Sequence, residues 1–140
     1  MKRYEVVVDV EAGAGAVWRA LLDVERWPEL TPSIDRVTRL DGGELRVGST
    51  ARVKQPRLPA LVWRVAVLEP DREFTWEAGS PGVRSVARHL IEPAGEDRCR
   101  LTLVLEMSGL LEPLVRPLIG GTVRRYVGFE ADGLKRCAET

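Results

Sequence analysis

Hydrophobic and charged residues alternate at the start of the chain. Over residues 3–11 every second side chain is apolar, and the side chains between them are mostly charged. A period of two is typical of a β-strand that is buried on one face only. The apolar set is Tyr4, Val6, Val8 and Val10. The sequence therefore predicts a first strand over residues 3–11.

The pattern then becomes helical for two short stretches. After a break at residues 13–15, apolar residues recur at the spacing of an amphipathic helix. They are Val17, Trp18, Leu21 and Leu22. Asp23 suits the start of another short turn, which we expect to end at Trp27–Pro28. Two short helices are therefore predicted after the first strand, with Trp18 and Trp27 bracing them.

Six further strand patterns follow, and they are arranged as hairpins. The stretches between paired strands are rich in Gly, Pro and Asp, which favour turns. The first hairpin has Asp41-Gly42-Gly43 as its turn, a strong hairpin signal. The predicted strands cover residues 34–40, 45–55, 61–67, 73–78, 83–91 and 98–107.

The last part of the chain has a helical period again. From about Pro113 to Ala138 the apolar positions form one stripe and the charged positions lie off it. Pro117 and the pair Gly120-Gly121 weaken a helix interior. We therefore predict a long C-terminal helix with a kink or break near these residues.

This order of elements predicts an α+β fold in which the helices lie on one face of an antiparallel sheet. A sheet of seven strands twists and curls. A straight helix does not fill a broad curved trough, so a gap is expected between the C-terminal helix and the concave face. That gap is the predicted ligand site.

The composition fits one globular domain that spans residues 1–140. The 140 residues are 44% hydrophobic and 30% charged, and a chain of this length can bury a core and still hold an internal pocket. Lys and Arg together number 21, as do Asp and Glu, so the formal net charge is zero. Nucleic-acid-binding domains usually carry a basic excess, so we predict no nucleic-acid partner.

Several other kinds of site and segment are not predicted. No run of about 18 apolar residues is present, so we expect no membrane-spanning segment and a cytoplasmic location. Cys99 and Cys137 lack the spacing of a metal site, and His89 is the sole histidine. The glycine pattern of a nucleotide-binding loop is absent too. We predict no metal, no cofactor and two reduced, packed cysteines.

Six segments carry a family resemblance that covers nearly the whole chain. They are VWRALLDVERWP (residues 17–28), GS (48–49), LVWRV (61–65), LEP (68–70), FTW (74–76) and RRYVGFEADGLK (124–135). With these segments the chain resembles the START/Bet v1-like (SRPBCC) superfamily, which includes proteins described as polyketide cyclase/dehydrase and lipid-transport proteins.

The resemblance implies a helix-grip fold. In that fold a seven-stranded curved antiparallel sheet surrounds a long C-terminal helix, and two short helices follow the first strand. It also implies a cavity that binds a hydrophobic small molecule. The superfamily has no shared catalytic motif that could be transferred to this chain, and a fold does not determine a function. The candidate residues therefore follow from the side chains of this sequence alone.

Three polar residues are candidates for acid–base chemistry in the cavity. His89 lies on the uncharged face of its strand, where an imidazole can act as a general base or bind a ligand. The alternative is a core histidine that bonds a backbone carbonyl or a neighbouring side chain. Glu130 lies near the apolar stripe of the last helix, where it would pair with His89 or, after a small rotation, with an arginine at the boundary. Tyr126 suits a pocket wall or a core edge.

The other candidates are ligand-binding side chains on inward faces. Successive side chains of a strand point to opposite faces of the sheet, and this alternation places four residues on the inward face. They are Gln55, Trp63, Phe74 and Trp76. Aromatic walls with a few polar groups are typical of pockets for apolar ligands, although the same rings equally suit an ordinary core. The predicted ligand-binding set is Gln55, Trp63, Phe74, Trp76, His89, Leu103, Tyr126 and Val127.

Three functions remain open at this point. The first is binding of a hydrophobic small molecule, lipid-like or polycyclic. The second is a polyketide cyclase or dehydratase in which His89, with Glu130 or Tyr126, moves protons. The third is a protein-interaction module that uses the apolar, proline-broken residues 110–119, which also suit a portal, a lid, a membrane contact or simple packing over the end of the barrel. We expect a monomer or a weak homodimer.

Overall fold

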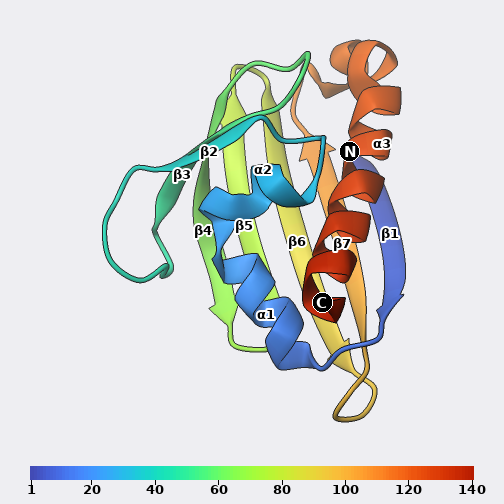
Figure 1. Ribbon diagram of the computed structural model, residues 1–140. Coiled ribbons are helices and arrows are strands. Elements are labelled where there is room, and N and C mark those ends of the chain that lie inside the picture. The colour runs from blue at the N-terminus through green and yellow to red at the C-terminus, as the bar shows by residue number, and fades with distance from the viewer.

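Seven antiparallel strands form one curved sheet in the structure, a computed structural model that describes residues 1–140 (Figure 1). The strands lie in the order β1-β7-β6-β5-β4-β3-β2. Strands β2 to β7 are therefore each next to their neighbour in sequence, whereas β1 joins the sheet beside β7. The strands are β1 (Lys2–Val10), β2 (Arg36–Arg39), β3 (Thr50–Lys54), β4 (Leu61–Glu69), β5 (Glu73–Ser80), β6 (Val83–Pro93) and β7 (Cys99–Ser108).

The helices cover one face of this sheet (Figure 1). Two short helices, α1 (Ala14–Leu22) and α2 (Trp27–Leu30), follow β1, and α3 (Glu112–Glu139) ends the chain. The long helix packs against β1, β7 and α1. This arrangement is the helix-grip α+β fold, and it confirms the predicted fold class. No helix combines the length and the apolar character needed to cross a bilayer.

The first hairpin differs from its prediction. Strands β2 and β3 are shorter than expected, and residues 40–49 connect them as a loop in place of a tight turn at Asp41. The Asp41 carboxylate accepts hydrogen bonds from the Ser49 hydroxyl and the Thr50 N–H. Gly48 has a φ of +93°, which an L-residue rarely adopts. The prediction of a strand from residue 45 was wrong because these loop contacts compete with strand pairing.

The second helical stretch is longer than predicted. A single 3-10 turn at Val24–Arg26 precedes α2, which begins at Trp27 and has Pro28 in its first turn. Proline is tolerated there because the first N–H groups of a helix have no partner inside it. The 3-10 turn has Asp23 at its N-cap and Trp27 at its C-cap, as the sequence predicted, and α2 extends the helical stretch beyond it. As a result, Trp27 is carried over the sheet, and its indole N–H donates to the Ala20 carbonyl over 3.1 Å.

The long helix is continuous from Glu112 to Glu139, so the predicted break does not occur. Pro117 cannot donate a backbone hydrogen bond and its ring crowds the carbonyl four residues earlier, yet the helix continues through it. One turn earlier, Arg116 donates to the Glu112 carboxylate over 2.7 Å and supports the same segment. Near the other end Gly133 allows a close approach, since a Cβ there would lie 2.3 Å from the Leu30 carbonyl oxygen.

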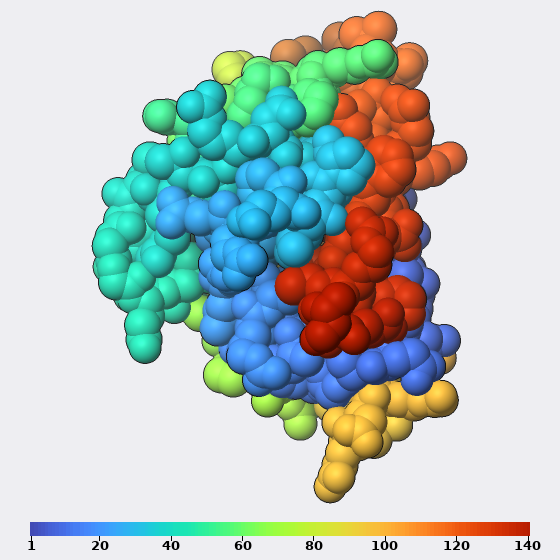
Figure 2. Space-filling view, in the orientation of Figure 1, coloured from blue at the N-terminus to red at the C-terminus, as the bar shows by residue number.

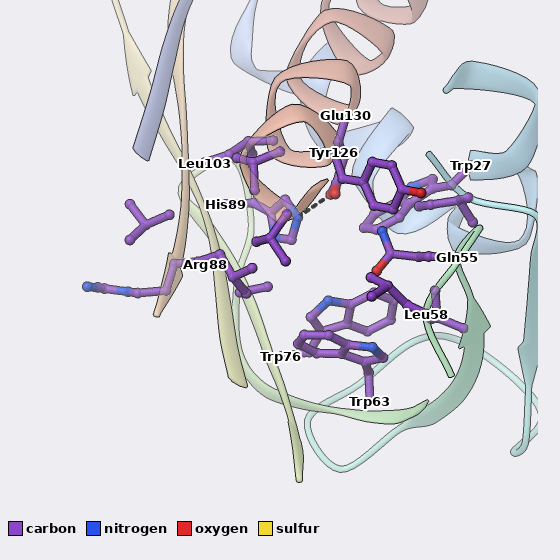
Figure 3. Close-up of a pocket in the computed structure, with 17 residues that line it drawn as sticks. Trp27, Gln55, Leu58, Trp63, Trp76, Arg88, His89, Leu103, Tyr126 and Glu130 are labelled. Carbon is purple, nitrogen blue, oxygen red and sulfur yellow. Dashed lines mark hydrogen bonds and ion pairs between the residues drawn. The ribbon is translucent and has the colours of Figure 1, made fainter. Parts of the chain in front are cut away.

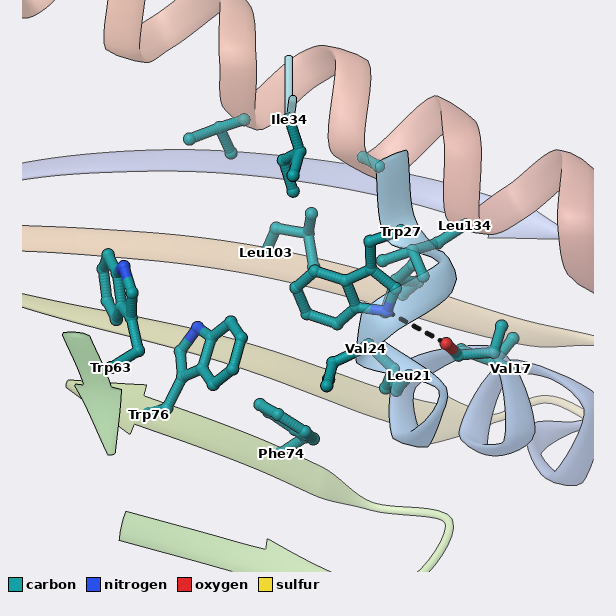
Figure 4. Packing of buried hydrophobic residues seen from close by; sticks show 14 of the residues in the cluster. Val17, Leu21, Val24, Trp27, Ile34, Trp63, Phe74, Trp76, Leu103 and Leu134 are labelled. Carbon is teal, nitrogen blue, oxygen red and sulfur yellow. Dashed lines mark hydrogen bonds between the residues drawn. The ribbon is translucent and has the colours of Figure 1, made fainter. Parts of the chain in front are cut away.

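The hydrophobic core lies between the concave face of the sheet and the three helices (Figure 4). Trp27 stands at its centre and is 2% exposed. Its indole ring is 5.3 Å from that of Trp76 and 6.0 Å from the Phe74 ring, measured between centroids. The second indole of the sheet, Trp63, lies 5.7 Å from Trp76. This aromatic group forms the floor beneath α3.

Candidate functional site

A pocket opens between α3, the sheet and the loop that joins β3 to β4 (Figure 3). Its volume is about 70 Å³, and 13 of its 17 lining residues are hydrophobic. The polar side chains that face it come from three elements. The lining residues are Trp27, Ile34, Val53, Gln55, Leu58, Trp63, Trp76, Ala87, Arg88, His89, Leu103, Val104, Leu105, Val123, Tyr126, Val127 and Glu130.

An imidazole and a carboxylate meet in this pocket. His89 lies on β6 and Glu130 on α3, and Nε2 of the imidazole is 2.8 Å from Oε1 of the carboxylate (Figure 3). The other ring nitrogen, Nδ1, is 2.9 Å from the backbone carbonyl oxygen of Phe74. The His89 side chain is 2% exposed and the Glu130 side chain 18% exposed. Glu130 therefore bonds His89, and the alternative partner, an arginine at the boundary, is not used.

The hydrogen-bond partners determine where protons lie. A carbonyl oxygen only accepts, so Nδ1 of His89 carries a proton and donates it to Phe74. The contact between Nε2 and Glu130 then needs one further proton. The pair is either an imidazolium with a carboxylate or a neutral imidazole that accepts from a carboxylic acid. In both forms it holds one proton that it can release to a bound molecule and later recover.

Strand pairing and ring packing position the imidazole. His89 lies opposite Phe74 in the register of β5 and β6, which explains why its Nδ1 reaches that carbonyl. The rings of Phe74 and Trp27 are 5.3 Å and 5.5 Å from the imidazole, measured between centroids. The imidazole therefore has little freedom to turn, and only its Nε2 edge faces the pocket.

One aromatic assignment from the sequence needs correction and another needs an addition. Phe74 points inward but is fully buried under Trp27 and Trp76, so it does not line the pocket. Trp27 braces the short helix α1 as expected, through its hydrogen bond to Ala20, and it also forms part of the pocket wall. The alternation of inward and outward residues along strands gives no information on an aromatic ring that a helix carries. The signal that could have placed it is Pro28 as the start of a helix that crosses the sheet.

The remaining predicted ligand-binding residues all lie in the lining, and two of them also tie the pocket's outer wall in place. The Tyr126 hydroxyl on α3 donates to the Pro56 carbonyl over 2.5 Å. The Gln55 side-chain amide donates to the Ser33 carbonyl over 3.2 Å. Residues 55–60 are thereby bound to α3 and to the segment before β2. Leu58, which the sequence did not single out, projects from this loop into the lining.

The side chains of this fold offer no preformed metal centre. No group of three or more His, Cys, Asp or Glu side chains comes close enough together to hold a metal ion. Both cysteines are free, with Cys99 buried and Cys137 partly buried. The Arg88 side chain extends away from the pocket (Figure 3). The polar groups that face the pocket are the His89–Glu130 pair, the Tyr126 hydroxyl and the Gln55 amide.

Comparison with known proteins assigns the chain to a family. A family model described as polyketide cyclase/dehydrase and lipid transport matches residues 1–139. The chain belongs to this family. No curated protein sequence matches it. Family membership together with the pocket supports a ligand-binding or cyclase role.

Solved structures share the fold of this polyketide cyclase/dehydrase family member. The aromatase/cyclase Zhui from Streptomyces sp. R1128 has a TM-score of 0.84 at 19% identity, over 99% of this chain and 93% of that one. A START superfamily protein from Mycobacterium smegmatis has a TM-score of 0.75 at 19% identity, over 96% and 97%. A norcoclaurine synthase point mutant from Thalictrum flavum, in complex with a transition-state analogue, has a TM-score of 0.73 at 16% identity, over 98% and 93%.

Proposed function

We propose that this protein binds a hydrophobic, ring-containing small molecule in the pocket between α3 and the sheet. The observation that carries the proposal is a wall of 13 hydrophobic residues around one polar pair, His89 and Glu130. An apolar lining with a few convergent polar groups is typical of small-molecule sites. The family membership of the chain and its likeness to an aromatase/cyclase support the same reading.

The aromatic lining favours a flat ligand. Trp63 and Trp76 lie 5.7 Å apart at an interplanar angle of 32°, and together they present a broad apolar surface beneath α3. Aromatic rings prefer offset or edge contacts with other rings. A polycyclic, polyketide-like molecule with hydroxyl or carbonyl groups would make such contacts and place a polar group beside His89. Among hydrophobic ligands it is therefore favoured over a flexible lipid chain.

The size of the pocket sets a condition on binding. A volume of about 70 Å³ is well below the roughly 300 Å³ at which pockets for drug-sized ligands begin. A polycyclic ligand therefore requires residues 55–60 to move away from α3. The Tyr126 and Gln55 hydrogen bonds are the contacts that must break, and both are made to backbone carbonyls that water can satisfy in the open form.

Thermal unfolding in the presence of a hydroxyanthraquinone tests the binding proposal. A ligand that binds the folded state raises the unfolding midpoint, and it should also quench the fluorescence of the pocket tryptophans. Ala87→Leu places three further carbon atoms in the pocket lining and should abolish both effects. The matched control is Ala66→Leu, at an exposed alanine on β4, which should bind like the wild type.

The binding proposal fails under two results. One is the absence of any midpoint shift or quenching across a panel of hydroxyanthraquinones, naphthols and fatty acids. The other is equal binding by Ala87→Leu and the wild type, which would put the ligand elsewhere on the molecule.

A specific observation favours a second, catalytic role, that of a cyclase or dehydratase. The His89–Glu130 pair holds a releasable proton beside an apolar cavity. Loss of water from a cyclic β-hydroxyketone needs one proton delivered to the departing hydroxyl and one removed from the carbon next to the ketone. The pair can do both in turn, so that a C–O and a C–H bond break, a C=C bond forms, and the pair returns to its initial state.

The dehydration of 3-hydroxy-1-tetralone to 1-naphthol and water tests this role, because the product is fluorescent. His89→Gln and Glu130→Gln should each lower the rate by about 10²-fold or more and leave the binding of 1-naphthol within about twofold. An unchanged rate in both variants would remove the catalytic role and leave the binding role intact.

A further inference from the structure

Three leucines, one just before α3 and two in its first turns, are largely exposed. Leu110 is 93% exposed, Leu114 69% and Leu118 80%. They are spaced four residues apart, so they lie on one face of the helix and its leading turn. We call these three residues the apolar tip. A row of leucines on the surface usually marks a contact with another molecule or with a membrane.

The charged residues within this segment neutralise each other. Between residues 109 and 123 the only ionisable side chains are Glu112 and Arg116, and the Arg116 guanidinium donates twice to the Glu112 carboxylate. Glu112 is 2% exposed and also lies 3.8 Å from the N-terminal amine. The apolar tip therefore carries no free charge.

A band of unpaired cations follows the apolar tip. Lys2 Nζ and Arg124 Cζ lie 5.6 Å and 5.9 Å from the centre of the same ring, that of Tyr4. Arg125 is exposed beside Arg124. None of these three cations takes part in an ion pair, since the salt bridges of the structure involve other side chains. With a rise of 1.5 Å per residue, Arg125 is about 10 Å along the helix from Leu118.

The apolar tip lies at the same end of the molecule as the loop that covers the pocket. In Figure 2 the first turns of α3, in orange, and the β3–β4 loop, in green, occupy the same end of the view. Figure 1 shows the same arrangement in the ribbon. That loop carries a further exposed cation, Arg57. Leucines and arginines are thus gathered where a ligand would enter.

We propose that this end of the molecule docks on a membrane surface rich in anionic phospholipids. The apolar tip would enter the boundary between headgroups and acyl chains, which is about 5–10 Å deep for an interfacial helix. Lys2, Arg124 and Arg125 would then lie at the level of the phosphates and contact them. The proposal uses residues outside the pocket, so it does not depend on which ligand the pocket takes.

Charge complementarity favours a lipid surface over a second copy of the chain. From residue 113 to residue 129 α3 contains no carboxylate. Two copies that met through this face would bring their Arg124 and Arg125 side chains together without an opposing charge. An anionic surface supplies that charge.

Vesicle co-sedimentation tests the proposal. The wild type should bind vesicles of equimolar phosphatidylcholine and phosphatidylglycerol, bind pure phosphatidylcholine weakly, and release from the anionic vesicles as salt is raised. The double variant Leu114→Ser, Leu118→Ser should lose roughly tenfold or more in affinity, because two leucines no longer enter the apolar phase. The control is Phe129→Ser, at a 42% exposed residue of the same helix, which should bind within about twofold of the wild type.

Two results would overturn the proposal. The first is an absence of binding to the anionic vesicles, or equal binding by the wild type and the double leucine variant. The second is a dimer in analytical ultracentrifugation that the double variant dissociates while vesicles are not bound, since the tip would then contact a second copy. The unfolding midpoints of the variants show whether they fold. The increase in midpoint caused by a hydroxyanthraquinone measures ligand binding in the pocket independently of vesicle binding.

Discussion

The two faces of α3 treat the same kind of side chain in opposite ways. Leu134 is 1% exposed and packs into the core, whereas Leu118 is 80% exposed. Sixteen residues separate them, which at 3.6 residues per turn places them on nearly opposite faces of the helix. The inward face is buried in both halves, since Val123 in the first half is also only 5% exposed and belongs to the core. Burial along this helix is thus decided by the face on which each residue lies.

Two of the glutamates of the helix, Glu112 and Glu130, show a related contrast. Glu112 binds Arg116 one turn away on its own helix, so its partner is local and its role is structural. Glu130 binds His89, 41 residues away in sequence and on the sheet. A carboxylate whose partner comes from another element, inside a pocket, is available for chemistry. The comparison suggests three mutational tests.

The largest difference is expected between the two leucines. Leu134→Ala should lower the free energy of unfolding by about 2–5 kcal/mol, because it leaves a cavity in the core. Leu118→Ala should change it by less than about 0.5 kcal/mol, since Leu118 is surrounded by water. Urea unfolding followed by circular dichroism measures both. Losses of similar size would mean that the face of α3 that carries Leu118 is also packed against the rest of the protein.

Two glycines of α3 should respond with opposite signs. A Cβ at Gly133 would lie 2.3 Å from the Leu30 carbonyl oxygen, whereas a Cβ at Gly121 would meet nothing within 4 Å. Gly133→Ala should therefore destabilise the protein by about 1–3 kcal/mol through overpacking. Gly121→Ala should stabilise it by about 0.5–1 kcal/mol, because alanine favours the helix. Urea unfolding followed by circular dichroism measures both changes in the free energy of unfolding. Stabilisation by both substitutions would show that α2 does not pack closely on α3.

The smallest effect is expected in the pH dependence of stability. Hydrogen bonds from Arg116 hold the pKa of the Glu112 carboxyl below its usual value. A carboxyl with a lowered folded-state pKa stabilises the fold above its unfolded-state pKa, and this contribution is lost as the pH falls through the folded-state value. Glu112→Gln should therefore lose stability at pH 7 and lose less of it between pH 5 and pH 3 than the wild type.

The control for this change is Glu44→Gln, at an exposed carboxylate in the loop between β2 and β3. The free energy of unfolding of this variant should depend on pH in the same way as that of the wild type over the same range. Parallel pH profiles for the wild type and Glu112→Gln, measured by urea unfolding, would contradict a stabilising role for the Glu112–Arg116 pair.

The sequence predicted most of the fold because strand and helix patterns are local. The alternation in residues 99–107 and the stripe of the last helix each reflect one buried face. The errors occur where other contacts override the pattern. Asp41 organises a loop where residues 45–49 suggested a strand, and Glu112 with Arg116 supports the helix near Pro117.

The candidate site was predictable in part. Strand parity placed His89, Trp63 and Trp76 on the inward face, and the helical stripe placed Glu130 close to it. Alternation along a strand shows which face a residue occupies but not how deeply its side chain is buried. It therefore could not show that Phe74 lies beneath the other rings. It also gave no information on Trp27, which reaches the pocket from a helix.

The amino-acid sequence by itself determined the number, type and order of the elements, because hydrophobic periodicity follows from which side of each element faces the core. Only the tertiary structure decided that His89 meets Glu130, that Trp27 replaces Phe74 in the pocket wall, and that the pocket has a volume of about 70 Å³. These features depend on the rotation of α3 and on how deeply each ring packs. Many side chains from distant parts of the chain set both quantities together.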